Sequence, residues 1–476
     1  MKLNGFQKQF QKRVSKIVSM LTGAKTGDLS PRSSQYLRPS QAGDYGLCHE
    51  PARRDGESGA RRDPGVWCGV RGQEIMVNNT FFICYGFYKR MGDLFGMPHR
   101  LHLFDHLESI ESRAEEWSDF SDSCRLAAPF CGPQVWIPWL RSHQHLAPAV
   151  YEWREDGELR ALLPMFRRGG SLEMATGPHL DYQDLAALDT ETAVLILLAI
   201  ARKEAGRHAT FVFPKVVPGS RLAKALEDPR ISAGTHHERR YWSQCPVASI
   251  DLSDRADFFD AIPARQRKDY RNARNRIAAA YPEYLVEHHG PGAFDPALLD
   301  DAVAQHRANQ YRKSGESVCA DPAYVRFLKD QASSGAPLCL SLIREHPGGP
   351  LMAFHLGYFA NDTFYYYLTS FSGEHAKVSP GRWLLVDALR HWSGHISGSV
   401  LRFDMLCGED GYKFRWTMTS YPVSRVVLIP KRLANLPRIL AYSTIYRLKN
   451  VKNRLRLQPH GGLIHTLDPE DIALPG

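Results

Sequence analysis

Residues 351–416 hold the pattern that most restricts the fold of this chain, because it predicts four elements in a fixed order. Residues 351–359 and 363–371 are apolar, aromatic-rich runs on either side of a short turn, as in a β-hairpin. A helix is expected to begin at Pro380, and a short strand from Val400 is expected to return beside the hairpin. This order places a helix N-terminus, which attracts anions, beside the end of a strand that carries a carboxylate.

The predicted helix start indicates a phosphate site. Ser379 is a preferred N-cap residue, and Pro380 at the first helical position needs no N–H partner. Residues 379–386 contain no Asp or Glu, and Gly381 lets a ligand approach the backbone amides closely. Ser379, Pro380, Gly381 and Arg382 are therefore the candidate donor-binding residues, and a plain capped helix is the alternative. The apolar positions expected to pack on a sheet are Trp383, Leu384, Leu385, Ala388, Leu389 and Trp392.

The strand from Val400 predicts the position of a catalytic carboxylate. Asp404 would lie near the strand end, where it could act as a general base, and Lys413 in the following loop could bind phosphate. An Asp404–Lys413 ion pair that only fixes the loop is the alternative. Glu409 and His355 are weaker candidates for the base, because a strand histidine is more often packed than catalytic.

Several short motifs, in this order, resemble the CelD-like acyltransferases of the GNAT superfamily, which are relatives of the FemAB peptidyltransferases. The motifs lie between about residues 106 and 430 and include Pro129-Phe130, Trp136-Ile137-Pro138-Trp139-Leu140, Asp156-Gly157 before Ala161-Leu162-Leu163-Pro164, His306-Arg307 with Gly315, and Gly-Glu-Asp-Gly-Tyr-Lys-Phe-Arg-Trp at 408–416. The resemblance implies two GNAT-like lobes and an acyl-CoA or acyl-tRNA donor, with an amine or hydroxyl acceptor. It also implies that the tetrahedral oxyanion meets backbone N–H groups of a splayed strand.

An internal repeat predicts the same two lobes without the family. Strand-like segments at 151–154 and 159–166, a helix at 193–205 and a strand at 209–213 recur roughly 190 residues later as 338–343, 351–359, the helix from Gly381 and the strand from Val400. The predicted fold is α/β, with tandem GNAT-like lobes of mixed β-sheets flanked by helices. The acidic turn 181–184 precedes the first lobe's helix and would repel phosphate, so the donor is expected in the second lobe.

A second basic feature lies at 265–276. Arg267, Arg271 and Arg274 are spaced by four and three, which places them on one helical face. Arg267 and Arg271 could hold a phosphate-bearing donor. RNA binding, a function of a different class, is an alternative interpretation of the same basic face. A solvated helix face is the simplest alternative.

The distribution of charge defines the remaining parts of the chain. Residues 411–467 contain 11 Lys or Arg and no Asp or Glu, so the net charge of +9 is a property of the tail. Its apolar residues recur at helical spacing, although Pro437 should interrupt the first run, and this pattern suggests contact with an anionic membrane surface, a partner groove or packing on the lobes.

The expected domains are residues 1–75 as a basic amphipathic segment and disordered extension, 76–246 as the first lobe with a lead-in, 247–430 as the second lobe with the donor site, and 431–476 as the basic tail. Met76 is a possible alternative start. The nine cysteines form no C-x-x-C pair, so we expect reduced thiols and no metal. The expected location is the cytoplasm, with peripheral contact at the inner face of the membrane through the tail.

The sequence thus predicts an acyltransferase that moves an acyl group, with acetyl-CoA as the expected donor, to an amine or hydroxyl of a small molecule or saccharide precursor. The resemblance links this activity to cellulose or exopolysaccharide production. FemAB-like aminoacyl transfer from tRNA and a non-catalytic GNAT-fold binding protein are the alternatives.

Overall fold

The computed structural model describes residues 100–456, except 125, 178, 205–209, 254–256 and 293, together with 465 and 466. The predictions for residues 1–75, the lead-in up to residue 99 and the alternative start at Met76 therefore lie outside the described residues.

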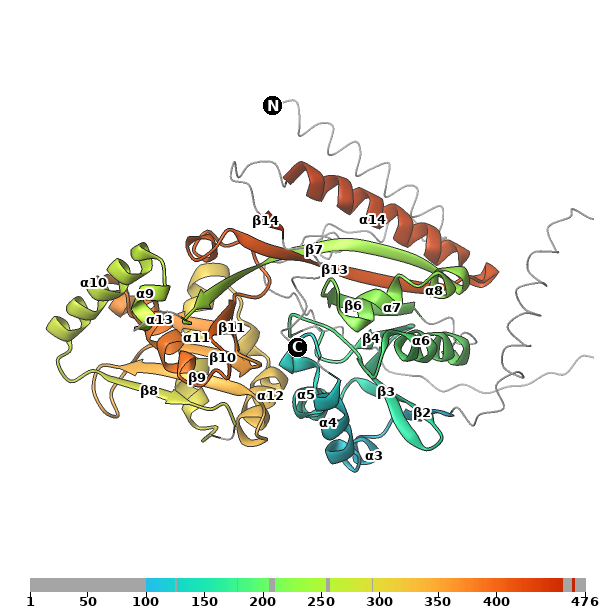
Figure 1. The fold of residues 1–476 in the computed structure, drawn as a ribbon, viewed down its shortest axis with the longest axis horizontal. Coiled ribbons are helices and arrows are strands. Elements are labelled where there is room, and N and C mark those ends of the chain that lie inside the picture. The colour runs from blue at the N-terminus through green and yellow to red at the C-terminus, as the bar shows by residue number, and fades with distance from the viewer. Residues whose placement is uncertain are drawn as a thin grey trace, which may run out of the picture.

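The described strands form one 14-stranded mixed sheet that runs through two lobes (Figure 1). Along the main path the strand order is β1-β2-β3-β4-β6-β13-β7-β12-β11-β10-β9-β8, and β5 and β14 pair with β3 and β13 off this path. The first-lobe elements are β1 (Arg100–Phe104), α3 (Leu107–Glu111), α4 (Ala114–Ser123), α5 (Pro133–Ser142), β2 (Ala147–Glu155), β3 (Glu158–Arg168), β4 (Ser171–Met174), β5 (Ala186–Ala187), α6 (Thr190–Glu204), β6 (Thr210–Val216), α7 (Arg221–Leu226) and α8 (Pro229–Gly234).

The second lobe repeats the topology of the first. Its elements are α9 (Phe258–Ala261), α10 (Ala264–Ala280), β8 (Leu285–His289), α11 (Leu298–Ser314), α12 (Pro322–Ser333), β9 (Leu338–Arg344), β10 (Leu351–Ala360), β11 (Thr363–Phe371), α13 (Pro380–Ser393) and β12 (Val400–Asp404). The series β9, β10, β11, α13 and β12 matches β2, β3, β4, α6 and β6, since in both the first three strands pair antiparallel and the strand after the helix pairs parallel. The predicted tandem α/β fold is confirmed.

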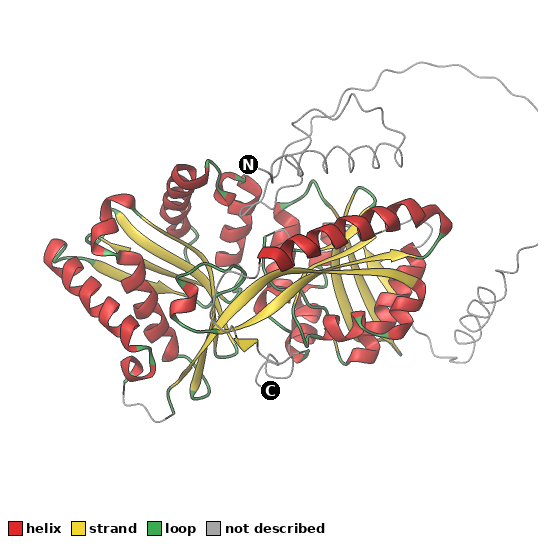
Figure 2. Ribbon diagram, turned by 90° about the horizontal axis from the view of Figure 1, so that it is seen from above, coloured by secondary structure: helices red, strands yellow, loops and turns green. Residues whose placement is uncertain are grey.

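Two long strands join the lobes (Figure 2). β7 (Thr235–Asp251) pairs with β13 (Thr419–Pro430) up to Pro246 and with β12 from Val247 onward. β13 comes late in the sequence, yet it also pairs with β6 of the first lobe. Backbone hydrogen bonds therefore continue from one lobe into the other.

Three large apolar cores hold the helices of the two lobes against the sheet, and a smaller fourth cluster lies under the C-terminal helix. α6 and α7 cover one face of the first-lobe strands, and α10 and α13 cover one face of the second-lobe strands. A third core lies on the opposite face, where α5 of the first lobe packs against α12 of the second. The predicted apolar positions of α13 are all buried in the second-lobe core, which confirms the predicted helix face.

The basic tail forms helix α14 (Leu436–Arg456), which lies over β7. Tyr446 is buried against Val427 and Ile429 of β13, with Ile439 packed beside it, so the first half of the helix packs on the sheet as one of the alternatives predicted. Pro437 does not interrupt the helix, because the helix begins at Leu436 and Pro437 lies in its first turn. Among the described helices, none is long and apolar enough to cross a bilayer.

Candidate functional site

The strands β11 and β12 of the second lobe separate after a short paired stretch. They pair in parallel only from Thr363 to Tyr365, opposite Arg402 to Asp404. β12 ends at Asp404, whereas β11 continues to Phe371, so within the described chain this edge of β11 has no strand beside it beyond Tyr365. Backbone N–H and C=O groups on such an edge can bind an extended ligand. We call this opening the β11–β12 splay.

Helix α13 begins close to the splay, with an acid-free first turn as predicted. A Cβ atom added to Gly381 would have only Phe371, at 3.9 Å, as a neighbour within 4 Å, so the backbone there is open to a ligand. Ser379 occupies the N-cap position as predicted, but the expected side-chain cap is wrong: the residue adopts a left-handed conformation with φ of 58°, and its side chain makes no capping hydrogen bond. The free amides of the first turn are therefore left without a side-chain acceptor from Ser379.

A cavity of about 820 Å³ lies between α11, the turn that joins β9 to β10, and the C-terminal end of β11. Its lining includes Asn309 and Arg312 of α11, Arg344 and Leu351 beside the β9–β10 turn, and Phe371 of β11. Its lining contains no residue of β12 or α13, so this cavity is separate from the splay. This volume falls within the usual range for small-molecule sites.

Histidine 355 fixes the first turn of α13 to β10. Its Nε2 lies 2.8 Å from the carbonyl oxygen of Gly381, which can only accept, so Nε2 carries the proton. Burial lowers the pKa of His355 to about 4, so the ring is neutral at pH 7. This contact positions the proposed donor-binding backbone, whereas the sequence suggested His355 as a candidate base.

The predicted donor arginines lie on or beside helix α10, which packs along α13 through the stacked rings of Tyr270 and Trp383. Arg382 lies 3.6 Å from Asp269, and Arg267 donates to Asp260 at 3.3 Å, while Arg271 is exposed. The arginine that reaches the helix start is Arg276, whose Nη2 lies 3.4 Å from the Ser379 hydroxyl. The spacing argument did not select Arg276.

Asp404 lies at the tip of the splay, buried on the face of the sheet that meets the first lobe. Its Oδ1 accepts from the Tyr182 hydroxyl at 2.6 Å and the Leu406 N–H at 2.9 Å, and its Oδ2 accepts from the Tyr421 hydroxyl at 2.6 Å. Burial raises the pKa of Asp404, although Arg402 and the two phenols oppose that rise.

Lys413 does not pair with Asp404, so the predicted ion pair is wrong. The Lys413 ammonium is buried and donates to the carbonyl oxygens of Cys407 at 2.8 Å and Leu406 at 3.4 Å. Strand β12 ends at Asp404, and the carbonyl groups of the following turn, not the Asp404 carboxylate, accept from the Lys413 ammonium. Glu409 is exposed and accepts from the Tyr241 hydroxyl at 2.5 Å.

The acidic turn of the first lobe is part of this site, which sequence reasoning missed. Tyr182 binds Asp404, and Asp181 accepts from the Cys407 N–H at 3.1 Å while it pairs with Lys215 at 2.9 Å. The turn therefore makes a contact between the lobes, and its predicted repulsion of phosphate stays a prediction. No local pattern could find this contact, since Tyr182 and Asp404 are 222 residues apart.

Backbone strain gathers around the same turn. Thr176, Lys215 and Leu406 all have positive φ angles, of 65°, 55° and 56°. Such angles are unfavourable for side chains of these types and persist where the surrounding contacts enforce them, often at functional sites. The Asp181–Tyr182 turn is held by these residues, since Leu180 N–H donates to the carbonyl of Thr176 and Lys215 Nζ to the carbonyl of Leu180.

Comparison with known proteins identifies part of the chain. The sequence profile described as the acetyltransferase (GNAT) domain matches residues 264–414, which contain α10, α13, the splay and Asp404. This segment of the second lobe is therefore similar to the GNAT acetyltransferase domain, and the match does not extend to the first lobe. A comparison with curated proteins gives no match.

Several solved structures resemble this chain over most of their own length. The crystal structure of FemX is 12% identical with a TM-score of 0.50, over 68% of this chain and 97% of that one. The C-terminal domain of a putative lysylphosphatidylglycerol synthetase from Agrobacterium fabrum is 14% identical (TM-score 0.44, 71% and 96% covered), and a tandem GNAT protein from the clavulanic acid biosynthesis pathway is 13% identical (TM-score 0.39, 70% and 98% covered). At these identities the FemX likeness shows a shared fold alone, and the two lower scores add no weight to it.

Proposed function

We propose that the protein is an acyltransferase that binds acyl-CoA, with acetyl-CoA as the expected donor, in the second lobe. The β11–β12 splay beside the acid-free start of α13 is the observation that carries this proposal. The edge of β11 can hold the amides of the donor's pantetheine arm, and the amides near Gly381 can hold its phosphates. Arg276, Arg267, Arg271 and Arg382 add positive charge on this side.

Transfer from a thioester needs mainly alignment and removal of a proton, because the leaving thiolate is already good. The acceptor is an amine or hydroxyl, and the CelD-like resemblance extends the proposal to a saccharide precursor. Asp404 is the proposed base, and it acts through the hydroxyls of Tyr182 and Tyr421, which occupy its oxygens. Lys413 and Glu409 are proposed to hold the loop that follows Asp404.

Calorimetric titration of the full chain with acetyl-CoA tests the donor site. Gly381→Glu should abolish saturable binding by placing a carboxylate where phosphate would lie. It should not unfold the helix, because the position is open and an acid in the first turn favours the helix dipole. Gly234→Glu, at a site with no atoms near its Cβ, is the matched control and should bind normally. Equal binding by wild type and Gly381→Glu would refute the proposed site.

Aminoacyl transfer from tRNA is the second candidate. The exposed arginines of α10 and the FemX-like fold favour it. A parallel titration with tRNA separates the two: saturable tRNA binding without acetyl-CoA binding would place aminoacyl transfer first. A non-catalytic binding protein would bind donor and release no thiol, whereas an enzyme should lose rate and keep donor binding in Asp404→Asn.

The basic tail is proposed to reach an anionic membrane surface from the cytoplasmic side. Leu433, Leu436 and Leu440 are exposed on its outer face, while Ile439 and Tyr446 pack inward. Sedimentation with vesicles of phosphatidylglycerol and phosphatidylcholine, and loss of binding in Leu436→Glu/Leu440→Glu, would support it. Equal binding to pure phosphatidylcholine would refute the role of charge.

A further inference from the structure

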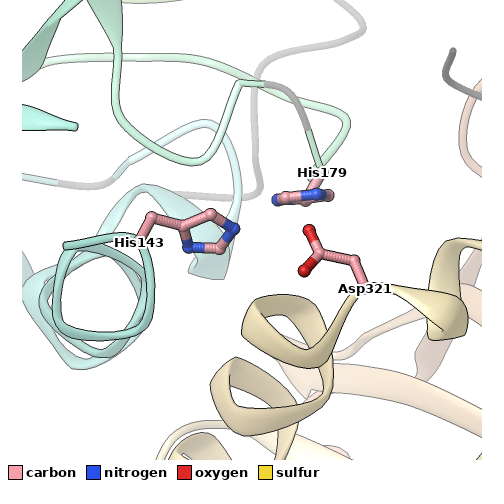
Figure 3. Close-up of side chains that lie close together, drawn as sticks. All are labelled: His143, His179 and Asp321. Carbon is pink, nitrogen blue, oxygen red and sulfur yellow. The ribbon is translucent and has the colours of Figure 1, made fainter. Parts of the chain in front are cut away.

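Two histidines of the first lobe and one aspartate of the second meet where the lobes join (Figure 3). His143 follows the last residue of α5, His179 lies between β4 and β5, and Asp321 caps α12. One nitrogen or carboxylate oxygen from each lies within 4.8 Å of the others. None of the three was selected from the sequence.

Trp139 determines which nitrogen of each histidine carries a proton. The Trp139 carbonyl can only accept, so Nδ1 of His143, 2.7 Å away, is the protonated nitrogen. The Trp139 indole N–H can only donate, and it donates to Nδ1 of His179 at 2.8 Å. In the neutral rings, Nε2 of His143 therefore carries a lone pair and Nε2 of His179 carries a hydrogen.

The lone pair of His143 has no hydrogen-bond partner in the described structure, although the side chain is 97% buried. Burial also lowers the pKa of His143, so the ring is a neutral acceptor at pH 7. A buried polar atom without a partner is costly and calls for a ligand that completes it. Asp321 adds a second acceptor: its Oδ1 takes the Ala323 N–H at 2.8 Å, and no hydrogen bond from a described residue goes to Oδ2.

These protonation states disfavour a metal ion. A metal needs a lone pair from each histidine, and His179 uses Nδ1 to accept from Trp139 and holds a proton on Nε2. One histidine lone pair and one carboxylate instead match a primary ammonium group, which brings one positive charge and three N–H donors.

The cluster lies beside the splayed strand. The hydroxyl of Tyr367 in β11, two residues beyond the last residue paired with β12, donates to the carbonyl of His179 at 3.1 Å. Tyr324 of α12 contacts the same hydroxyl at 2.6 Å. Tyr367 packs on the apolar core shared by the lobes, whereas α13 covers the opposite face of β11, so an acceptor at the cluster would approach from the side away from α13.

We propose that His143 and Asp321, beside His179, bind the amino group of the acyl acceptor, with Asp321 pairing with the ammonium and Nε2 of His143 taking its proton. This inference rests on the proposed acyl transfer and selects an amine over a hydroxyl acceptor. The ammonium loses one proton to His143, the free amine forms the C–N bond with the thioester carbon, and the C–S bond breaks. A second proton leaves the nitrogen, and the departing thiolate takes up one proton.

The test is an NMR titration of the full chain, labelled with ¹³C and ¹⁵N in histidine, with n-propylamine at pH 7.5. Saturable shifts of the His143 ring signals are expected with n-propylamine and not with tetramethylammonium, which has the charge but no N–H. Asp321→Asn should weaken binding about tenfold. The helix should be retained, because Asn caps as well as Asp. In His143→Gln the ring signals of the neighbouring His179 should no longer shift with n-propylamine, and His106→Gln, at an exposed histidine, should not change the response.

Three results would overturn the proposal: no shift of the His143 signals, equal shifts with tetramethylammonium, or stoichiometric Zn²⁺ binding that His143→Gln removes. The titration contains no acetyl-CoA, so its failure is separate from failure of the donor site. If His143→Gln still binds acetyl-CoA and still releases thiol when an amine is added, the proposed acyltransferase function stands. That result would refute the proposed acceptor site alone.

Discussion

The two tyrosines that bind Asp404 should contribute unequally to stability, and the structure gives the order. Tyr182→Phe removes one donor from Oδ1, which keeps the Leu406 N–H. Tyr421→Phe removes the one donor seen on Oδ2. A hydrogen bond to a charged group is worth about 1.5–3 kcal/mol, and a buried oxygen left without a partner adds a desolvation cost. We expect losses of about 1.5 kcal/mol for Tyr182→Phe and about 3 kcal/mol for Tyr421→Phe.

Urea unfolding at pH 7.5, followed by both tryptophan fluorescence and circular dichroism, measures these losses as shifts in midpoint at constant m. Tyr311→Phe, at an exposed tyrosine, is the control and should stay within about 0.5 kcal/mol of wild type. In an Asp404→Asn background the loss from Tyr421→Phe should shrink, because the charged acceptor is gone. Equal losses, a larger loss for Tyr182→Phe, or an unchanged loss in the Asn background would refute the assignment of Asp404 as a buried carboxylate held by both phenols.

Three further predictions test other parts of the structure. Gly357→Ala should lower the unfolding free energy by about 2 kcal/mol in thermal melts, because the new Cβ would lie 2.6 Å from the Tyr365 carbonyl oxygen. The control Gly234→Ala should change the unfolding free energy little in the same assay. Burial lowers the pKa of His355 to about 4, so the unfolded state binds a proton at higher pH than the folded state does, and the unfolding free energy falls as the pH drops from 6.5 toward 4. The unfolding free energy of His355→Gln should therefore fall by about 1.4 kcal/mol less per pH unit than that of wild type over this range. Parallel curves of unfolding free energy against pH would contradict this prediction. Cys339 is buried with a raised pKa, so mass spectrometry should find it unmodified by iodoacetamide at pH 8 in the folded protein and modified in urea.

The elements of the second lobe could be predicted because their signals are local. Pro380 and the apolar spacing behind it fix the start and the buried face of α13, and continuous apolar, aromatic-rich runs fix β10 and β11. The detail at Ser379 could not be predicted. Ser379 also ends the preceding 3-10 helix, Gly373–Val378, in a left-handed conformation, which the capping preference of serine does not predict.

The candidate site was predicted only in part. Asp404 was placed correctly at a strand end, because a strand has a fixed rise and β12 ends there. Its partners were not predicted: Lys413 binds carbonyls of the loop, and the donors to Asp404 come from Tyr182 and Tyr421. The alternative of an ion pair with Lys413 fails because the chain turns at Leu406, which has a positive φ.

The sequence by itself determined the two α/β lobes, the order of their strands and helices, and the acid-free helix start, since each follows from propensity and periodicity within about 20 residues. Only the tertiary structure decided that β7 and β13 carry one sheet through both lobes, that Tyr182 reaches Asp404, and that His143 meets Asp321. The physical reason is that such contacts join residues far apart in sequence. Their geometry is set by how the whole sheet and its helices pack, which no short segment encodes.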